Sequence, residues 1–187
     1  MSALAQTDMT AEAFLAWAME QPEGQRYELD GGEVVAMAPE RIAHARAKVR
    51  FLRRFADAID AQGLTCEVFG DGMAVRVDAD TVYEPDMLVR CGPPLDDTAV
   101  VIGDPMIIVE VVSPSSRRRD SGSKLEAYFR LPSVRHYLIV KTDNQAIIHH
   151  RRDEAGEIST RIVRDGVIAL DPPGLVVTGL FVAGVGG

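Results

Sequence analysis

The sequence predicts a single α/β or α+β domain, in which a mixed β-sheet carries helices on its faces. Two buried strands, IIVEVV at 107–112 and HYLIV at 136–140, enclose a helical pattern at 120–131. A longer helical pattern at 41–61 stands among short alternating segments that are typical of strands. The 187 residues suit one domain with a real core, and no linker or repeat divides them.

The first predicted elements are a short helix and a hairpin. Residues 11–20 place Phe14 and Ala18 on one helical face, and Thr10 can cap the N-terminus. We expect this helix to pack as a lid. The segment RYELDGGEVVAM at 26–37 alternates polar and apolar residues around its Asp-Gly-Gly centre, which predicts a hairpin with short strands.

The longest predicted helix runs from Arg41 to about Ala61 and ends before Gly63. An apolar stripe marks the face expected to be buried, formed by Ile42, Ala45, Val49, Leu52, Phe55, Ala56 and Ile59. The outward face carries Arg46, Arg50, Arg53 and Arg54. His44 and Lys48 lie on a flank between the two faces.

The rest of the chain alternates strands with one further helix. We expect strands at 64–69, 73–77, 86–90 and 107–112, a helix at 120–131, and strands or edge segments at 136–140, 146–152, 157–163 and 176–182. Pro132 stops the helix. Within it, Leu125 and Phe129 are one turn apart and are predicted to face the core.

Composition and charge limit the class of protein. With 47% hydrophobic and 26% charged residues the chain looks globular. It has no membrane-span window of roughly 20 apolar residues and no signal-peptide pattern, so we expect a cytoplasmic protein. The net charge of −8 argues against a broad non-specific grip on a polyanion, although local basic patches remain able to contact phosphate. Cys66 and Cys91 fit no metal-ligand spacing and make no disulfide framework, and we interpret both as small buried hydrophobes.

Glu110 lies inside the apolar run IIVEVV. An ionised carboxylate needs compensation there, so Glu110 must be neutralised, paired, at the open end of the strand, or bound to a metal. Asp86 follows Pro85 at the start of a neighbouring strand, so both carboxylates can converge on one point. Convergent oxygen ligands suit a hard cation such as Mg²⁺ or Mn²⁺. Two other interpretations stay open: an ion pair between Glu110 and a buried arginine, and a turn or strand-edge role for Asp86.

Several motifs together resemble the PD-(D/E)XK nuclease superfamily, through Pro85-Asp86 and Glu110-Val111-Val112. The fuller set resembles its Uma-type restriction endonuclease family: YELDGGEV at 27–34, His44 opening a helix, PDMLV, EVVSPSS, Asp120, Lys124, Tyr128 and HYLIV. The resemblance covers about residues 25–141, and the PPGLVV tail also fits. It implies a restriction-endonuclease-like domain, with a helical segment at 1–24, a nuclease core at 25–141 and C-terminal strands at 142–187.

The resemblance implies a metal site. Asp86 and Glu110 would hold the metal with the backbone carbonyl of Val111, and Glu28 would be a further ligand or a water-orienting acid. From the residues alone, an acid in a hairpin strand such as Glu28 is equally well an exposed surface group.

One departure from the superfamily concerns its lysine. Val112 stands where the superfamily usually has that residue. Within the Uma-type family the lysine is thought to have moved to the following helix, where Lys124 is the match. Asp120, Lys124 and Tyr128 recur at i, i+4 and i+8, so they lie along one helix face. That face can return an ammonium group to the Glu110 strand.

Substrate contacts are predicted for His44, Arg50, Arg54, Arg117 and Tyr128. His44 would contact phosphate or shuttle a proton, and the arginines would position the backbone of the substrate. The alternatives are a core-edge histidine, a solvated arginine face and a packing aromatic whose hydroxyl has a local partner.

The first hypothesis is a Mg²⁺- or Mn²⁺-dependent endonuclease that hydrolyses nucleic-acid phosphodiester bonds, with DNA as the expected substrate. A binding or assembly module on the same fold, without catalysis, is the main alternative, since position 112 lacks lysine and the chain is acidic. A phosphoesterase acting on a small ester is a third. The apolar C-terminal segments favour a homodimer.

Overall fold

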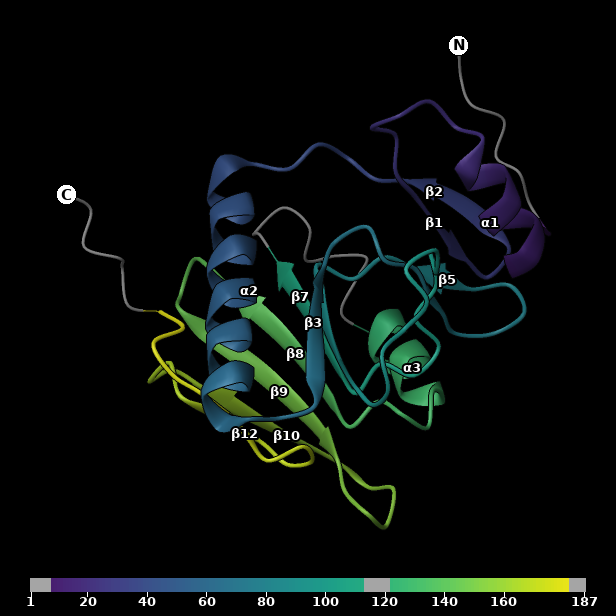
Figure 1. Cartoon of the computed structure of the whole chain (residues 1–187). Helices are drawn as coiled ribbons and strands as arrows, with labels where there is room; N and C mark the ends of the chain where they lie inside the picture. The colour runs from purple at the N-terminus through teal and green to yellow at the C-terminus, as the bar shows by residue number, and fades with distance from the viewer. Residues whose placement is uncertain (1–7, 113–121, 182–187) are drawn as a thin grey trace.

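The computed structural model describes residues 8–112 and 122–181, and Figure 1 shows the arrangement of its helices and strands. The helices are α1 (Ala11–Met19), α2 (Ile42–Gln62) and α3 (Ser123–Arg130). The strands are β1 (Tyr27–Asp30), β2 (Glu33–Ala36), β3 (Cys66–Gly70), β4 (Val75–Arg76), β5 (Val82–Tyr83), β6 (Met87–Cys91), β7 (Ile107–Val112), β8 (His136–Lys141), β9 (Ala146–Arg152), β10 (Ile158–Val163), β11 (Ile168–Leu170) and β12 (Leu175–Val177). Of these described helices, none has the length and apolar character needed to cross a membrane.

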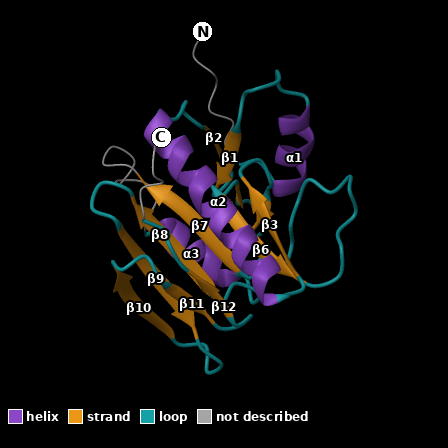
Figure 2. Cartoon of the chain, turned by 60° about the vertical axis from the view of Figure 1, so that its left-hand side comes forward, coloured by secondary structure: helices purple, strands orange, loops and turns teal. Residues whose placement is uncertain are grey.

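The main sheet has six strands in the order β10-β9-β8-β7-β6-β3. Only the β7–β8 pair is parallel, and α3 lies in the crossover between these two strands, as a parallel connection requires. Along β7, Ile107 and Val109 pack with α2, whereas Ile108 and Val112 pack with α3. The sheet is therefore covered on both faces, which confirms the predicted mixed α+β fold. Figure 2 shows α2 running diagonally across the strands.

Helix α2 has the predicted extent, but its buried face differs from the predicted stripe. Gly63 ends it in the left-handed conformation with φ 62°, which glycine adopts without steric cost. Its buried residues are Ala47, Phe51, Phe55 and Ile59, at a strict i, i+4 repeat. Ile42 and Val49 are 71% and 56% exposed, so their inclusion in the buried stripe was wrong. The physical reason is rotational phase, because the face set by Phe51 and Phe55 turns Val49 toward solvent.

A second sheet, in the order β2-β1-β5-β4, carries helix α1. The side-chain oxygen of Thr10 accepts a hydrogen bond from the backbone N–H of Ala13, as the predicted cap requires. Phe14 packs with Leu29 of β1 and Val82 of β5 in a separate apolar cluster. Helix α1 therefore covers the hairpin sheet, and its sheet brings β1 toward the end of β7.

Cys66 and Cys91 form a disulfide in the structure, so the interpretation as unpaired buried hydrophobes was wrong. The two residues are directly opposite each other in the antiparallel β3–β6 pair, and both are half-buried. Direct cross-strand partners lie close enough for their side chains to meet. Sequence spacing could not show this, because the register between strands 25 residues apart is set by the fold.

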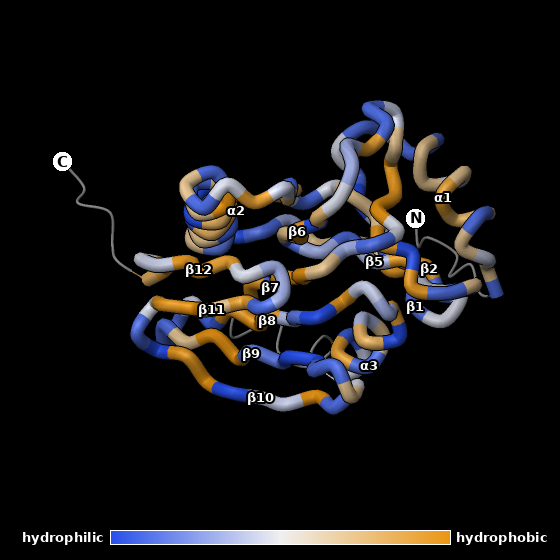
Figure 3. The backbone as a smooth tube through the Cα atoms, turned by 60° about the horizontal axis from the view of Figure 1, so that its bottom comes forward, coloured by the Kyte–Doolittle hydropathy of each residue, from blue (hydrophilic) through white to orange (hydrophobic). Residues whose placement is uncertain are grey.

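The C-terminal part folds back on the main sheet. Strands β11 and β12 pair with each other, and Figure 3 shows the hydrophobic stretch of β12 beside α2. A chain of polar groups with two buried histidines joins this part to the sheet. Arg161 Nε lies 3.0 Å from His149 Nδ1, and His149 Nε2 lies 2.9 Å from His136 Nδ1. His136 Nε2 lies 2.8 Å from the carbonyl oxygen of Pro172. These bonds connect β8, β9 and β10 to the turn before β12.

Candidate active site

The two predicted carboxylates stand opposite each other. Strands β6 and β7 are antiparallel, with Met87 paired to Val109, so continuing this register places Asp86 opposite Glu110. Opposite residues of an antiparallel pair share one face of the sheet. Asp86 Oδ2 accepts a 2.7 Å hydrogen bond from the backbone N–H of Val111, which fixes its position at the end of the ladder. The predicted convergence of the two strands is thus present in the fold.

Glu110 is buried, with 8% of its surface exposed, and helix α3 supplies its partners. Lys124 Nζ lies 3.1 Å from Glu110 Oε1, and the hydroxyl of Tyr128 donates to the same oxygen at 2.9 Å. The two donors are four residues apart, so both project from one side of α3. Among the residues that the structure describes, Glu110 is thus paired with a lysine and a tyrosine from α3.

Glu28 of β1 completes this group. Its Oε1 lies 2.9 Å from Lys124 Nζ and accepts a 3.0 Å hydrogen bond from the backbone N–H of Glu84. Lys124 therefore bridges two carboxylates from strands of different sheets. Glu28 is only partly exposed and does not have the freely solvated position of a surface hairpin acid.

The electrostatics of the group reflect burial. Burial raises the pKa of Glu110 to about 7, with Asp86 and Glu28 adding to the rise and Lys124 opposing it. Burial also raises the pKa of Tyr128 well above its ordinary value, and the Glu110 carboxylate adds to that rise. Burial therefore disfavours the charged forms of both Glu110 and Tyr128.

Helix α2 approaches Asp86 from the other side through His44 and Lys48. His44 Nε2 lies 3.4 Å from Asp86 Oδ2, and His44 Nδ1 lies 3.1 Å from Glu40 Oε2. The Asp86 carboxylate raises the pKa of His44 despite partial burial. The 3.4 Å separation is long for a hydrogen bond, and Nε2 is buried without a hydrogen-bond partner, so the contact with Asp86 is mainly electrostatic. His44 therefore holds an unused polar atom at the edge of the site.

Lys48 belongs to the same group, although sequence reasoning did not include it. Its Nζ lies 2.7 Å from Asp71 Oδ2, 2.9 Å from Glu40 Oε2 and 3.5 Å from Asp86 Oδ1. Burial lowers and these acids raise the pKa of Lys48, and the net shift is upward. The available signal was its position one turn after His44, on the same flank of the helix.

The predicted arginine contacts lie elsewhere on the molecule. Arg50 lines a cavity on the other flank of α2, and the guanidinium of Arg54 lies against Gly179, where an added Cβ would come within 3.4 Å of it. Arg117 lies outside the described residues. For Val111, the N–H bond to Asp86 is seen, and the metal-ligand role of its carbonyl stays a prediction.

The chain matches a protein-family model over most of its length. The model of the Uma2 family, which is described as "Putative restriction endonuclease", matches residues 11–180. This chain belongs to the Uma2 family. The match spans both sheets and every residue of the group described above, so the resemblance inferred from the motifs is confirmed.

Two relatives agree with this membership. The Uma2 chain is 28% identical over 148 residues to an uncharacterized protein of Synechocystis, covering 78% of this chain and 76% of that protein. It also resembles the crystal structure of a "putative nuclease belonging to DUF820" from Anabaena variabilis, with a TM-score of 0.67 and 15% identity. That match covers 89% of this chain and 91% of the other, and it shows a shared fold.

The donor set of this Uma2 site is compatible with a divalent cation. Asp86 and Glu110 offer oxygen donors on one face of neighbouring strands. The described residues contain no group of three or more His, Cys, Asp or Glu side chains arranged to hold a metal. Mg²⁺ is commonly bound through one or two carboxylates together with water, so the pair Asp86 and Glu110 is compatible with that ion.

Proposed function

We propose that the chain is a metal-dependent endonuclease that hydrolyses phosphodiester bonds of nucleic acid, with DNA as the expected substrate. The observation that carries the proposal is Glu110, a buried carboxylate opposite Asp86 that contacts both Lys124 and Tyr128. A structural ion pair would explain the contact between Lys124 and Glu110. It would not explain why Asp86 stands opposite Glu110 on the same face of the sheet, or why Glu28 contacts the same Lys124 ammonium.

Mg²⁺ or Mn²⁺ would be held by Asp86 and Glu110, with the carbonyl of Val111 as a further oxygen donor. When bound, such a cation lowers the pKa of a coordinated water and polarises a phosphoryl oxygen. The protein's part is to hold both carboxylates in position. The Val111 N–H fixes Asp86, and the Tyr128 hydroxyl fixes Glu110.

Lys124 is the proposed catalytic cation. Its ammonium would stabilise the negative charge that develops on the transferred phosphoryl group, and Glu28 would keep its Nζ at the site. This assignment answers the absence of lysine at position 112, which was the main support for an inactive binding module. Position 112 is a valine buried against α3, and Lys124 supplies an ammonium to the same sheet face from that helix.

Substrate contacts are proposed for His44, Arg50, Arg54 and Arg117. His44 is the best placed for a phosphate oxygen, because its Nε2 makes no hydrogen bond among the described residues and lies 3.4 Å from Asp86 Oδ2. The arginines would neutralise flanking phosphates and position the strand without reading its sequence.

A plasmid-nicking assay in Mg²⁺ and in Mn²⁺ tests this function. Asp86→Asn and Glu110→Gln should each abolish cleavage, while Asp57→Asn and Glu67→Gln, which make the same changes at exposed positions, should cleave like the wild type. Circular dichroism and thermal melting of every variant confirm that it folds. If the double variant Asp86→Asn/Glu110→Gln cleaves at the wild-type rate, the proposed metal and catalytic site is wrong.

We also propose a homodimer, as expected from the C-terminal segments. Strand β10 is an edge of the main sheet, and its Ile158 and Ile162 are 48% and 60% exposed. An open edge with apolar side chains is a surface that second copies pair on. Sedimentation velocity of the wild type and of Ile162→Lys measures this directly, and a monomeric wild type would contradict it.

A further inference from the structure

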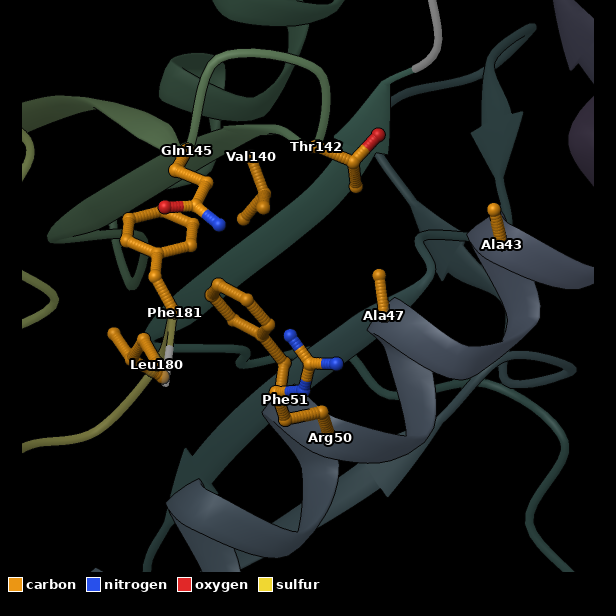
Figure 4. A pocket seen from close by; sticks show the side chains of 9 residues that line it. All are labelled: Ala43, Ala47, Arg50, Phe51, Val140, Thr142, Gln145, Leu180 and Phe181. Atoms are coloured by element: carbon orange, nitrogen blue, oxygen red, sulfur yellow. The ribbon is translucent and has the colours of Figure 1, made fainter. Parts of the chain in front are cut away.

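A cavity of about 200 Å³ lies on the flank of α2 that faces away from Asp86. Its wall is formed by Ala43, Ala47, Arg50, Phe51, Val140, Thr142, Gln145, Leu180 and Phe181. Figure 4 shows Ala43 and Ala47 on the helix side and Phe181 with Gln145 across the space. None of the residues that contact the carboxylates lines it, so the cavity is separate from the site described above.

The apolar part of the wall suits a flat ring. Ala43 and Ala47 are one helical turn apart, and their small side chains leave the space open. The rings of Phe51 and Phe181 meet at 64° with centroids 6.2 Å apart, so a planar group in the cavity would contact an aromatic face or edge. The volume is below the ~300–1,000 Å³ of sites for drug-sized ligands, which limits an occupant to one small ring system.

The polar part of the wall offers the groups that recognise a nucleobase. The Gln145 amide can donate and accept hydrogen bonds together, as the edge of a base requires, and the Thr142 hydroxyl can do either. Figure 4 shows the Gln145 amide beside the Phe181 ring and the Arg50 guanidinium near Phe51. Gln145 also has a positive φ of 48°, a conformation that glycine or asparagine adopts more readily. A glutamine at this turn position keeps a long amide side chain at the mouth of the cavity.

The cavity and the proposed active site lie on two flanks of the same helix, α2. On α2, Ala43 and Ala47 each precede by one residue the side chains that face Asp86, namely His44 and Lys48. One residue corresponds to a rotation of 100° and a rise of 1.5 Å, so the two features are about one helix width apart, roughly 10 Å. A nucleotide strand with its phosphate at Asp86 can therefore place a neighbouring base at the cavity.

We propose that this cavity binds one unpaired base of the nucleic-acid substrate, extruded from its stack next to the cleaved phosphate. The inference rests on the proposed function and specifies its substrate: a strand containing an unpaired or mispaired nucleotide is preferred over a fully paired duplex. The Phe51 and Phe181 rings and the two alanines form the apolar walls, and Gln145 and Thr142 bond the base edge. Arg50, at the rim, contacts the phosphate of that nucleotide.

Binding without cleavage tests this. The full chain carrying Glu110→Gln is titrated in Mg²⁺, by fluorescence anisotropy, with a paired duplex and with the same duplex containing one unpaired 2-aminopurine. Stacking of the base on aromatic side chains is favourable, so the second duplex should bind about tenfold tighter, which corresponds to about 1.4 kcal/mol. The 2-aminopurine emission should rise on binding, because the base leaves its stack.

Variants assign the effect to the cavity. Ala43→Leu fills it from an exposed position and should remove the preference, and Ala61→Leu, the same change at an exposed position near the other end of α2, should retain it. Gln145→Gly removes the amide without filling the space and should reduce the preference. A preference that persists in both Ala43→Leu and Gln145→Gly overturns the proposal, as does equal affinity for the two duplexes. Wild-type plasmid cleavage is scored separately, so an inactive protein with this preference refutes only the nuclease function. The riboside of 2-aminopurine, tested alone, overturns the proposal if it binds as tightly as the duplex that contains it.

Discussion

Replacing Lys124 with methionine should slow cleavage by about 10²–10³-fold, because the substitution removes one electrostatic stabiliser of the transition state. Methionine keeps the apolar stem and lacks only the ammonium, which lies 2.9 Å from Glu28 Oε1 and 3.1 Å from Glu110 Oε1. The hydroxyl of Tyr128 still donates to Glu110 at 2.9 Å. The carboxylate geometry should therefore survive, and divalent-cation binding with it.

The same change has a cost in stability that the structure bounds. Removing one partner of a buried ion pair destabilises by about 3–5 kcal/mol when the remaining charge is left uncompensated. Two features reduce that cost here: Tyr128 keeps one hydrogen bond to Glu110, and the site opens toward solvent at Glu28, which is not fully buried. Urea denaturation measures the loss, and cleavage is assayed where both proteins remain folded.

Single-turnover plasmid cleavage in Mg²⁺ then compares Lys124→Met with Arg164→Met, which loses the same charge at an exposed position. Val112→Lys in the Lys124→Met background should recover part of the rate, since positions 110 and 112 share one face of β7. Val112 is only 7% exposed, so crowding limits the recovery. Undiminished cleavage by Lys124→Met would refute the argument that α3 supplies the catalytic ammonium.

Three further outcomes are expected. Tyr128→Phe should destabilise the protein by about 1–3 kcal/mol, because the hydrogen bond to Glu110 is lost. Urea denaturation of Tyr128→Phe, of Glu110→Gln and of the double variant isolates the free energy of that bond. Burial lowers the pKa of His136 to about 4, so between pH 4 and the unfolded pKa of about 6.5 the unfolded chain binds the extra proton. The contribution of His136 to stability should therefore be complete above about pH 7 and fall by up to about 3 kcal/mol as the pH drops to 4. Thermal melting between pH 4 and 7 checks this, and the melting temperature of His136→Gln should change less with pH than that of the wild type. Reversing Arg50 and Arg54 to Glu should weaken DNA binding and lower its salt dependence, and unchanged affinity at low salt would show that neither arginine contacts phosphate.

Local signals predicted much of the fold. Thr10 caps α1, Gly63 ends α2, and the apolar runs at 107–112 and 136–140 are buried strands, because each signal acts within a few residues of the chain. The errors concern how elements meet. The disulfide depends on strand register, which short-range patterns do not contain.

Rotational phase produced the other error. Apolar spacing along α2 is compatible with more than one buried face. Packing on the sheet buries the face that contains Phe51 and leaves the face that contains Val49 exposed.

Strands β5 and β11, of two and three residues, are too short to show a period in the sequence.

In the candidate site, too, short-range spacing predicted the contacts of neighbouring residues and could not predict those that depend on the packing of distant elements. The i, i+4 spacing of Lys124 and Tyr128 predicted that they share a helix face, and both do contact Glu110. The contact between Glu28 and the Lys124 ammonium depends on how the two sheets pack, because these residues are 96 positions apart in the chain. Motif resemblance supplied that residue, and helical spacing did not.

A single carbonyl group determines which ring nitrogen carries the hydrogen in His136 of β8 and in His149 of β9. The oxygen of Pro172 can only accept, so His136 must carry its hydrogen on Nε2 and leave Nδ1 as an acceptor. His149 must then donate from Nε2, which leaves its Nδ1 to accept from Arg161. The two rings are therefore the same tautomer, and the chain of donors runs one way, from the guanidinium to the backbone. An added proton on either ring places two donors face to face, so acid acts on this part of the molecule by breaking a directional relay.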